Sequence, residues 1–176
     1  MQINPKEIAP GAYQVILSDS EQQSFADIMS LEKDLIDLYG YTIAAELGAD
    51  YSWFARSDWT HLLNYAPAQG EFVGLWHTDF DERTNCSLII YNVKPNLDSA
   101  HGARIRFRLD ESKDSWTIDI KSPVDAILMR ADAEKFQHSV EPLGSEKVEQ
   151  RNILLYGFKN WNNVQTKFNL GQELSG

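Results

Sequence analysis

The stretch GLWHTDF, residues 74–80, holds a histidine and a carboxylate separated by one residue. In a β-strand, residues two apart point to the same face, so His77 and Asp79 can both reach one metal ion. The pair is a weak signal by itself, because a chain with 4 His and 26 acidic residues can produce it by chance. The residues that accompany the pair must therefore decide whether it is a metal site.

Three other features of the chain fit such a site. A second histidine, His138, lies in KFQHSVEP, which we place after a strand and a short loop. Two imidazoles and one carboxylate that leave positions open are the ligand set of non-haem Fe(II) oxygenases. Arg151 opens RNILLYGF, on the same face as Ile153 by alternation, and a buried guanidinium requires an anion such as a carboxylate. Tyr65, in LLNYAP, offers a hydroxyl that can share that carboxylate.

The order of these residues resembles one enzyme family. The chain carries, in sequence, Tyr65, His77-x-Asp79, His138-x-Val140-x-Pro142 and Arg151. This order is similar to that of the Fe(II)- and 2-oxoglutarate-dependent dioxygenases, in their prolyl 4-hydroxylase-like branch, over roughly residues 60–158. The resemblance implies a double-stranded β-helix, or jelly roll, in which His77, Asp79 and His138 ligate Fe(II). It also implies that Arg151 binds the distal carboxylate of 2-oxoglutarate and that Tyr65 helps to hold it.

The resemblance extends to the walls of the site. Val140 would line the co-substrate pocket with Ile89, and Tyr91, on the same strand face as Ile89, is a candidate second contact to the co-substrate. Family members often carry serine two residues after the arginine, where this chain has Ile153. Halogenating relatives have a small residue in place of the carboxylate, so the presence of Asp79 favours hydroxylation.

The expected activity is hydroxylation of an aliphatic C–H bond in a small molecule or an amino-acid or prolyl-type substrate, with release of succinate and CO2. The cofactors would be Fe(II), 2-oxoglutarate and O2, with ascorbate in support. One alternative is a metal-dependent hydrolase that uses the same His/Asp/His site, which would need a general base and would leave Arg151 without a purpose. A second alternative is a non-catalytic jelly-roll binding module. The substrate, free or peptide-bound, and the oligomeric state are not indicated.

The secondary structure that must position these residues is predicted to change from helices to strands along the chain. We expect a mainly β fold with N-terminal helices (α+β) and a single dioxygenase domain over 1–176, with helical support over 1–50 and the jelly-roll core over about 51–170. Short aromatic and β-branched runs between turn residues predict the strands. The predicted strands are 12–17, 51–57, 60–66, 71–77, 86–93, 103–109, 115–121, 124–130, 151–158 and 164–170.

The segment 18–48 reads as helix, with a buried stripe that includes Leu35 and Leu38. Gly40 would divide it into two helices, and Gly48 is a plausible stop. In RIRFRL, Arg104, Arg106 and Arg108 are expected to form a solvated face, and Trp76 is read as a core or rim aromatic. The polar run DFDERTN, 79–85, borders the site as a candidate substrate lid.

The composition and net charge of the chain argue against some classes of partner. The net charge of −10 argues against nucleic acid, because phosphate neutralisation needs clustered Lys and Arg. No apolar run is long enough to span a bilayer, and the start of the chain lacks the pattern of a signal peptide. We therefore expect a cytoplasmic protein without membrane partners. Cys86, the single cysteine, excludes an intramolecular disulfide.

Overall fold

The computed structural model describes residues 2–16, 30–58, 76–79, 81–92, 104–110, 114–118, 125–140 and 152–171. Its strands are β1 (Lys6–Ala9), β2 (Ala12–Ile16), β3 (Asp50–Asp58), β4 (Cys86–Asn92), β5 (Ile105–Leu109), β6 (Trp116–Ile118), β7 (Asp125–Arg130), β8 (Phe136–Val140) and β9 (Asn152–Lys159), and its helices are α2 (Lys33–Leu47) and α4 (Trp161–Phe168). The predicted strand 60–66 and most of 71–77 lie outside the described residues.

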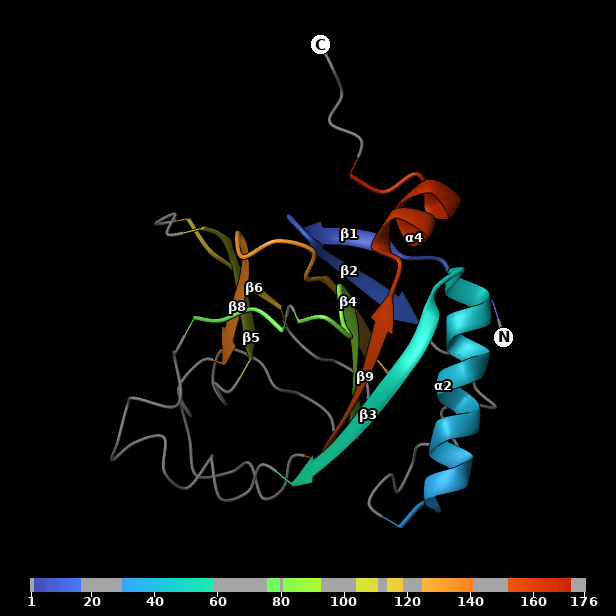
Figure 1. Ribbon diagram of the computed structural model, residues 1–176. Helices are drawn as coiled ribbons and strands as arrows, with labels where there is room; N and C mark the ends of the chain where they lie inside the picture. The colour runs from blue at the N-terminus through green and yellow to red at the C-terminus, as the bar shows by residue number, and fades with distance from the viewer. Residues whose placement is uncertain are drawn as a thin grey trace.

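The strands form two sheets (Figure 1). The large sheet has the order β1-β2-β7-β4-β9-β3 and the small sheet has the order β6-β5-β8. Every pair is antiparallel. From β4 onward the chain passes from the large sheet to β5 and β6, back to β7, across to β8 and back again to β9. This repeated crossing between two antiparallel sheets is the wrapping of a jelly roll, so the predicted fold class is confirmed.

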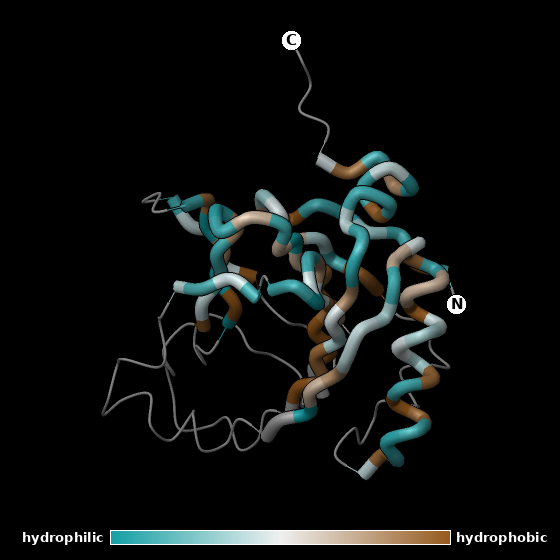
Figure 2. The backbone as a smooth tube through the Cα atoms, viewed as in Figure 1, coloured by the Kyte–Doolittle hydropathy of each residue, from teal (hydrophilic) through white to brown (hydrophobic). Residues whose placement is uncertain are grey.

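Hydrophobic and hydrophilic residues are interspersed along the strands (Figure 2), and the buried apolar side chains form two clusters. One cluster joins the sheets face to face, and its members are Ala9, Ala12, Ile89, Ile105, Phe107, Ile127, Met129 and Ile153. The other cluster fills the space between the large sheet and the helices. It contains Leu88, Ile90, Leu128, Leu154, Tyr156 and Phe158 from the strands, with Ile36, Ile43 and Leu47 from α2. The large sheet is therefore covered on both faces.

Helix α2 differs from its prediction in three respects. It begins at Lys33, because residues 30–32 are not helical, and residues 18–29 of the predicted helix lie outside the described part. It runs through Gly40 without a break. Gly40 is buried, and a Cβ at this position would lie 2.6 Å from Tyr51 Cε2 and 3.0 Å from Tyr156 Cε1. The glycine is required by the close approach of two rings, and it does not end the helix. The expected stripe is also wrong at Leu38, which is 60% exposed. Gly48 does end the helix, with a φ of 75°.

The C-terminal element was predicted wrongly. The segment 164–170 does not form a strand, because α4 covers most of it. Trp161 and Val164 are buried at a spacing of three, which suits a helix that packs on the core. Two short strands, β1 and β8, were not predicted. His138 does follow a strand and a short loop, as expected, because β7 ends at Arg130, but the strand β8 that contains it was not predicted.

Neither described helix has the length and apolar content that a membrane crossing would need. The cytoplasmic location and the single domain over 1–176 stay predictions.

Candidate metal centre

The small sheet carries His138 on its inner face. In the β5–β8 ladder His138 pairs with Phe107, whose side chain is part of the cluster between the sheets. On the other side of β8, His77 N–H donates to the carbonyl of His138 at 3.0 Å, and His138 N–H donates to the carbonyl of His77 at 2.8 Å. Directly opposed residues of antiparallel strands point to the same face. The row Phe107–His138–His77 therefore lies on one face, with ring centroids 6.2 Å and 4.2 Å apart.

Asp79 completes the group of three predicted ligands. Its Oδ1 lies 3.9 Å from His77 Nε2, and its Oδ2 lies 3.6 Å from His138 Nε2. One potential ligand atom from each residue lies within 4.8 Å of the other two. Ligand atoms bound at about 2.0–2.2 Å to one first-row metal ion stand roughly 3 Å apart, so the two carboxylate–imidazole distances would each shorten by up to about 1 Å if an ion were bound. Two imidazole nitrogens and one carboxylate on one side fit a metal with open positions.

The two histidines differ in their surroundings. The side chain of His77 is 47% exposed, and that of His138 is 10% exposed. Burial lowers the pKa of His138 to about 4, although Asp79 acts in the opposite direction. The imidazole of His138 is therefore neutral at neutral pH and keeps a lone pair for a metal. The group thus has a buried side at His138 and an open side at His77.

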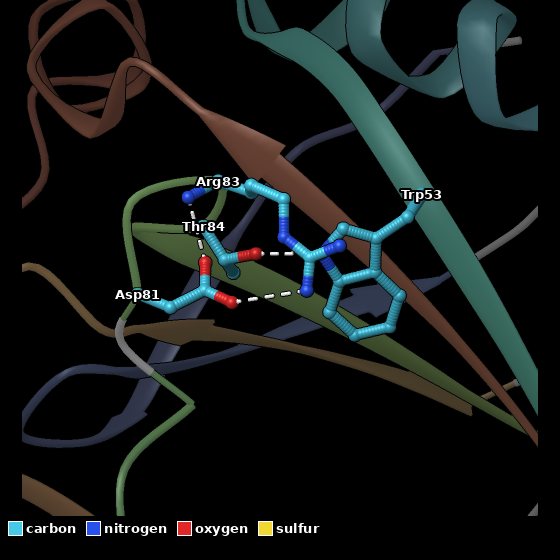
Figure 3. A network of polar contacts seen from close by, with 4 residues as sticks. All are labelled: Trp53, Asp81, Arg83 and Thr84. Carbon is cyan, nitrogen blue, oxygen red and sulfur yellow. Dashed lines mark hydrogen bonds and ion pairs between the residues drawn. The ribbon is translucent and has the colours of Figure 1, made fainter.

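The segment after Asp79 forms a tight turn that is tied to the large sheet (Figure 3). Backbone bonds join Asp81 and Thr84, and the Asp81 carboxylate accepts the N–H of Arg83 at 2.7 Å. The indole N–H of Trp53, on β3, donates to Thr84 Oγ1 at 2.7 Å. The backbone hydrogen bond lowers the pKa of Asp81, with help from the Arg83 side chain. The predicted role of this segment as a substrate lid is not tested by the turn and stays a prediction.

The outer face of the small sheet is less open to solvent than was predicted, because Arg106 and Arg108 are half-buried. The guanidinium carbons of Arg106 and Arg108 lie 5.2 Å and 4.5 Å from the ring centroid of Trp76. Arg106 Nε donates to Ser139 Oγ at 3.1 Å, and Arg108 Nε donates to Gln137 Oε1 at 2.7 Å. This Trp76–Arg106–Arg108 stack was missed because it depends on the pairing of distant segments.

Apolar side chains border the group on the inner face. Val140 pairs with Ile105 and shares the face of His138, two residues away. Ile89 and Ile153, from the large sheet, belong to the same cluster as Ile105. The predicted apolar lining therefore lies in the layer between the sheets, although its contact with a co-substrate stays a prediction.

The structure leaves three predicted co-substrate contacts untested. Tyr65 and Arg151 lie outside the described residues. The backbone of Tyr91 pairs with Ile153 in the β4–β9 ladder, but its side chain lies outside the described part. The next residue after Arg151, Asn152, begins β9.

Comparison with known proteins gives weak likenesses only. No family model matches the chain, and no curated protein matches its sequence. Among solved structures, it is similar to a Pseudomonas putida prolyl-4-hydroxylase, with 14% identity, a TM-score of 0.39, and coverage of 90% of this chain and 77% of that one. It is also similar to a dTDP-4-dehydrorhamnose 3,5-epimerase from Elizabethkingia anophelis NUHP1, with 9% identity, a TM-score of 0.38, and coverage of 93% and 79%. Both scores are too low to bear on activity, and the fold assignment rests on the strand order.

Proposed function

We propose that the protein is an Fe(II)- and 2-oxoglutarate-dependent dioxygenase that hydroxylates an aliphatic C–H bond of a small molecule or an amino-acid or prolyl-type substrate. The observation that carries the proposal is the convergence of His77, Asp79 and His138 on the inner side of a jelly roll. These residues come from two segments that are far apart in the sequence. Two imidazoles and a carboxylate suit Fe(II) and leave positions for a co-substrate and O2.

The side chains of the group would hold the metal and shape its surroundings. When bound, Fe(II) with 2-oxoglutarate supplies the oxidation by O2 that yields succinate and CO2 and hydroxylates the substrate. The buried imidazole of His138 is neutral and can bind without first losing a proton. Val140, Ile89 and Ile105 would exclude water and offer few groups for oxidation.

Co-substrate binding is assigned to Arg151, which directly precedes β9 in the sequence, and to two tyrosines. If the alternation of this strand continues one residue back, Arg151 shares the inner face with Ile153. A guanidinium there would pair with the distal carboxylate of 2-oxoglutarate. Tyr65 and Tyr91 are proposed as further contacts to the co-substrate.

A metal hydrolase is the competing function for the same ligands. Such an enzyme needs a general base beside the metal-bound water. Within the described residues, the group that could hold a metal consists of His77, Asp79 and His138, and using all three as ligands leaves none of them to act as that base. The dioxygenase therefore fits the group better, since it requires no protein base there.

The test is an anaerobic titration with Fe(II), followed by 2-oxoglutarate, that monitors the visible charge-transfer band of the chelate. We expect a band that is lost in His77→Ala and that needs far more 2-oxoglutarate in Arg151→Ala. Lys147→Ala, which removes the other cation near this part of the sequence, is the matched control and should titrate like the parent protein. A folded protein that takes up the metal and shows no band would contradict the dioxygenase and favour the hydrolase or a binding module.

A further inference from the structure

The strand segment that carries His77 is paired with β8 at the edge of the small sheet. The antiparallel register fixes which residues share its two faces. Since His77 pairs with His138, Trp76 lies beside Ser139, and alternation puts both on the outer face. In the next strand, Arg106 pairs with Ser139 and Arg108 pairs with Gln137. The outer face therefore carries a second row of contacts, directly behind the row of potential metal ligands.

The indole of Trp76 reaches across β8 to the third strand. It meets the guanidinium carbons of Arg106 and Arg108, 5.2 Å and 4.5 Å from the ring centroid. Ser139, which lies between them in the register, has an exposed fraction of 0%. A cation–π contact of this kind is favourable at a surface, and it is stronger when the cation is partly desolvated. One side chain thus links the segment of His77 to β5, across β8.

The two guanidiniums are themselves fixed in place. Each uses its Nε–H on an oxygen of β8, from Arg106 to Ser139 and from Arg108 to Gln137. A planar group that is held along one edge keeps its face available for stacking. The two arginines, held by β8, and the indole that stacks on them therefore form a clamp, the Trp76–Arg106–Arg108 stack.

We propose that Trp76 is a positioning residue, whose stacking on Arg106 and Arg108 holds His77 opposite His138 so that the metal ligands share one face. The metal in this statement rests on the proposed function, whereas the clamp itself does not. A shift of one residue in the pairing would turn His77 to the outer face and Trp76 to the inner face. The clamp opposes that shift, because the two arginines on which the indole stacks lie on the outer face.

The first test needs no metal. Amide hydrogen exchange of the metal-free protein reports the two bonds between His77 and His138, with the amides of β4 as an internal reference. In Trp76→Ala we expect exchange at these two amides to be faster by on the order of 10-fold, with β4 unchanged. Trp76→Phe, which keeps an aromatic face, should restore most of the protection. Arg108→Leu, which removes the nearer cation, should reproduce the effect of Trp76→Ala.

The second test measures metal affinity by anaerobic titration with Co(II). Loss of residues that orient metal ligands costs about 10- to 100-fold in affinity, and we expect that range for Trp76→Ala. Trp116→Ala is the matched control, because it removes an exposed tryptophan from β6 of the same sheet and should bind like the parent protein. Trp76→Phe should again recover most of the affinity, which a general loss of stability would not explain.

The outcomes separate the clamp from the metal function. Unchanged exchange at His77 and His138 in Trp76→Ala overturns the proposal, whatever the metal does. Faster exchange with unchanged Co(II) affinity also overturns it, because the stack would then be structural only. A parent protein that binds no Co(II) contradicts the proposed function, and the exchange data still decide whether the clamp holds His77.

Discussion

The large sheet and the small sheet are built in different ways. The large sheet has long ladders, from Asp50↔Lys159 to Asp58↔Asn152 between β3 and β9, and apolar residues cover both of its faces. The small sheet is short, and one of its faces carries a polar and aromatic stack in place of an apolar layer. The group of His77, Asp79 and His138 lies on the small sheet and on the segment that joins it to the large one.

This difference separates the residues that stabilise the fold from the residues that could bind a metal. Apolar area removed from water is the main source of folding free energy, and the larger of the two buried apolar clusters lies between the large sheet and the helices. Metal ligands have to be polar and partly open, so they weaken the layer that carries them. We therefore expect substitutions in the large sheet to change the free energy of unfolding, and substitutions in the small sheet to change metal affinity.

The largest expected effect is on the large sheet. Phe158 has an exposed fraction of 0% and packs against Tyr51 and Tyr156, with ring centroids 6.2 Å and 6.1 Å away. Phe158→Ala should lower the free energy of unfolding by about 3–5 kcal/mol, because it leaves a cavity in a layer that cannot collapse. Urea unfolding measures this. The paired control is Leu38→Ala on α2, which removes a 60% exposed side chain and should cost less than about 0.5 kcal/mol.

The labelling rate of Cys86 compares the stability of the two sheets in the native protein. Its thiol is buried in β4, and burial raises its pKa from 9.0 to about 12. A thiol reagent at pH 8 can therefore label Cys86 only when the large sheet opens. The free energy of unfolding should also fall as the pH rises above 9, because the thiol then ionises in the unfolded chain but stays protonated in the folded protein. A thiol reagent in excess should label Phe158→Ala at least about 100-fold faster than the parent protein. Trp76→Ala should label like the parent, and a large acceleration there would show that the two sheets open together.

Gly40 tests how closely α2 lies on the large sheet. In an exposed helix, Gly→Ala stabilises by about 1 kcal/mol. Here a Cβ would meet the rings of Tyr51 and Tyr156, and Tyr51 is held by a hydrogen bond from its hydroxyl to Asp37 Oδ1 at 2.6 Å. We expect Gly40→Ala to lower the free energy of unfolding by about 1–3 kcal/mol in a urea titration. A gain in stability would mean that the rings yield and that this contact is loose.

The fold could be predicted from the sequence where local pattern and packing agree. The segments of β2, β3, β4, β5, β6, β7 and β9 have the alternation and residue types of strands, and each is a strand. The strand prediction for the α4 segment was wrong because Val164 and Phe168 fit both an alternating strand and a helix. The burial of Trp161 on the core favours the helix. The prediction for Gly40 was wrong because the need for glycine is set by the rings of Tyr51 and Tyr156, which lie on the strands β3 and β9.

The candidate site divides in the same way. The types and parity of His77 and Asp79 are visible in the sequence, and their meeting with His138 was expected from the resemblance to a family. The clamp behind them was not predicted, because no local feature of Trp76 indicates that Arg106 and Arg108 lie two strands away. Alternation correctly placed these arginines on the outer face, but it says nothing about what covers that face.

The smallest expected effect lies where the two regions are joined. Thr84 is 1% exposed, and it accepts the indole N–H of Trp53 from β3 at the end of the turn that follows Asp79. Thr84→Val keeps the shape and removes the acceptor, so we expect a loss of about 1 kcal/mol in the free energy of unfolding. The control is Thr42→Val on α2, whose hydroxyl bonds to the carbonyl of Leu38 at an exposed position and should matter less.

The same variant should also weaken Co(II) binding by a few-fold, since Asp79 loses part of its anchor to the large sheet. Metal titration and urea unfolding of one protein sample give both numbers. A change in stability without a change in affinity would mean that the turn is held mainly from the small-sheet side, where Trp76 lies next to His77. A change in affinity alone would make the Trp53–Thr84 hydrogen bond a support of the ligand set and not of the fold.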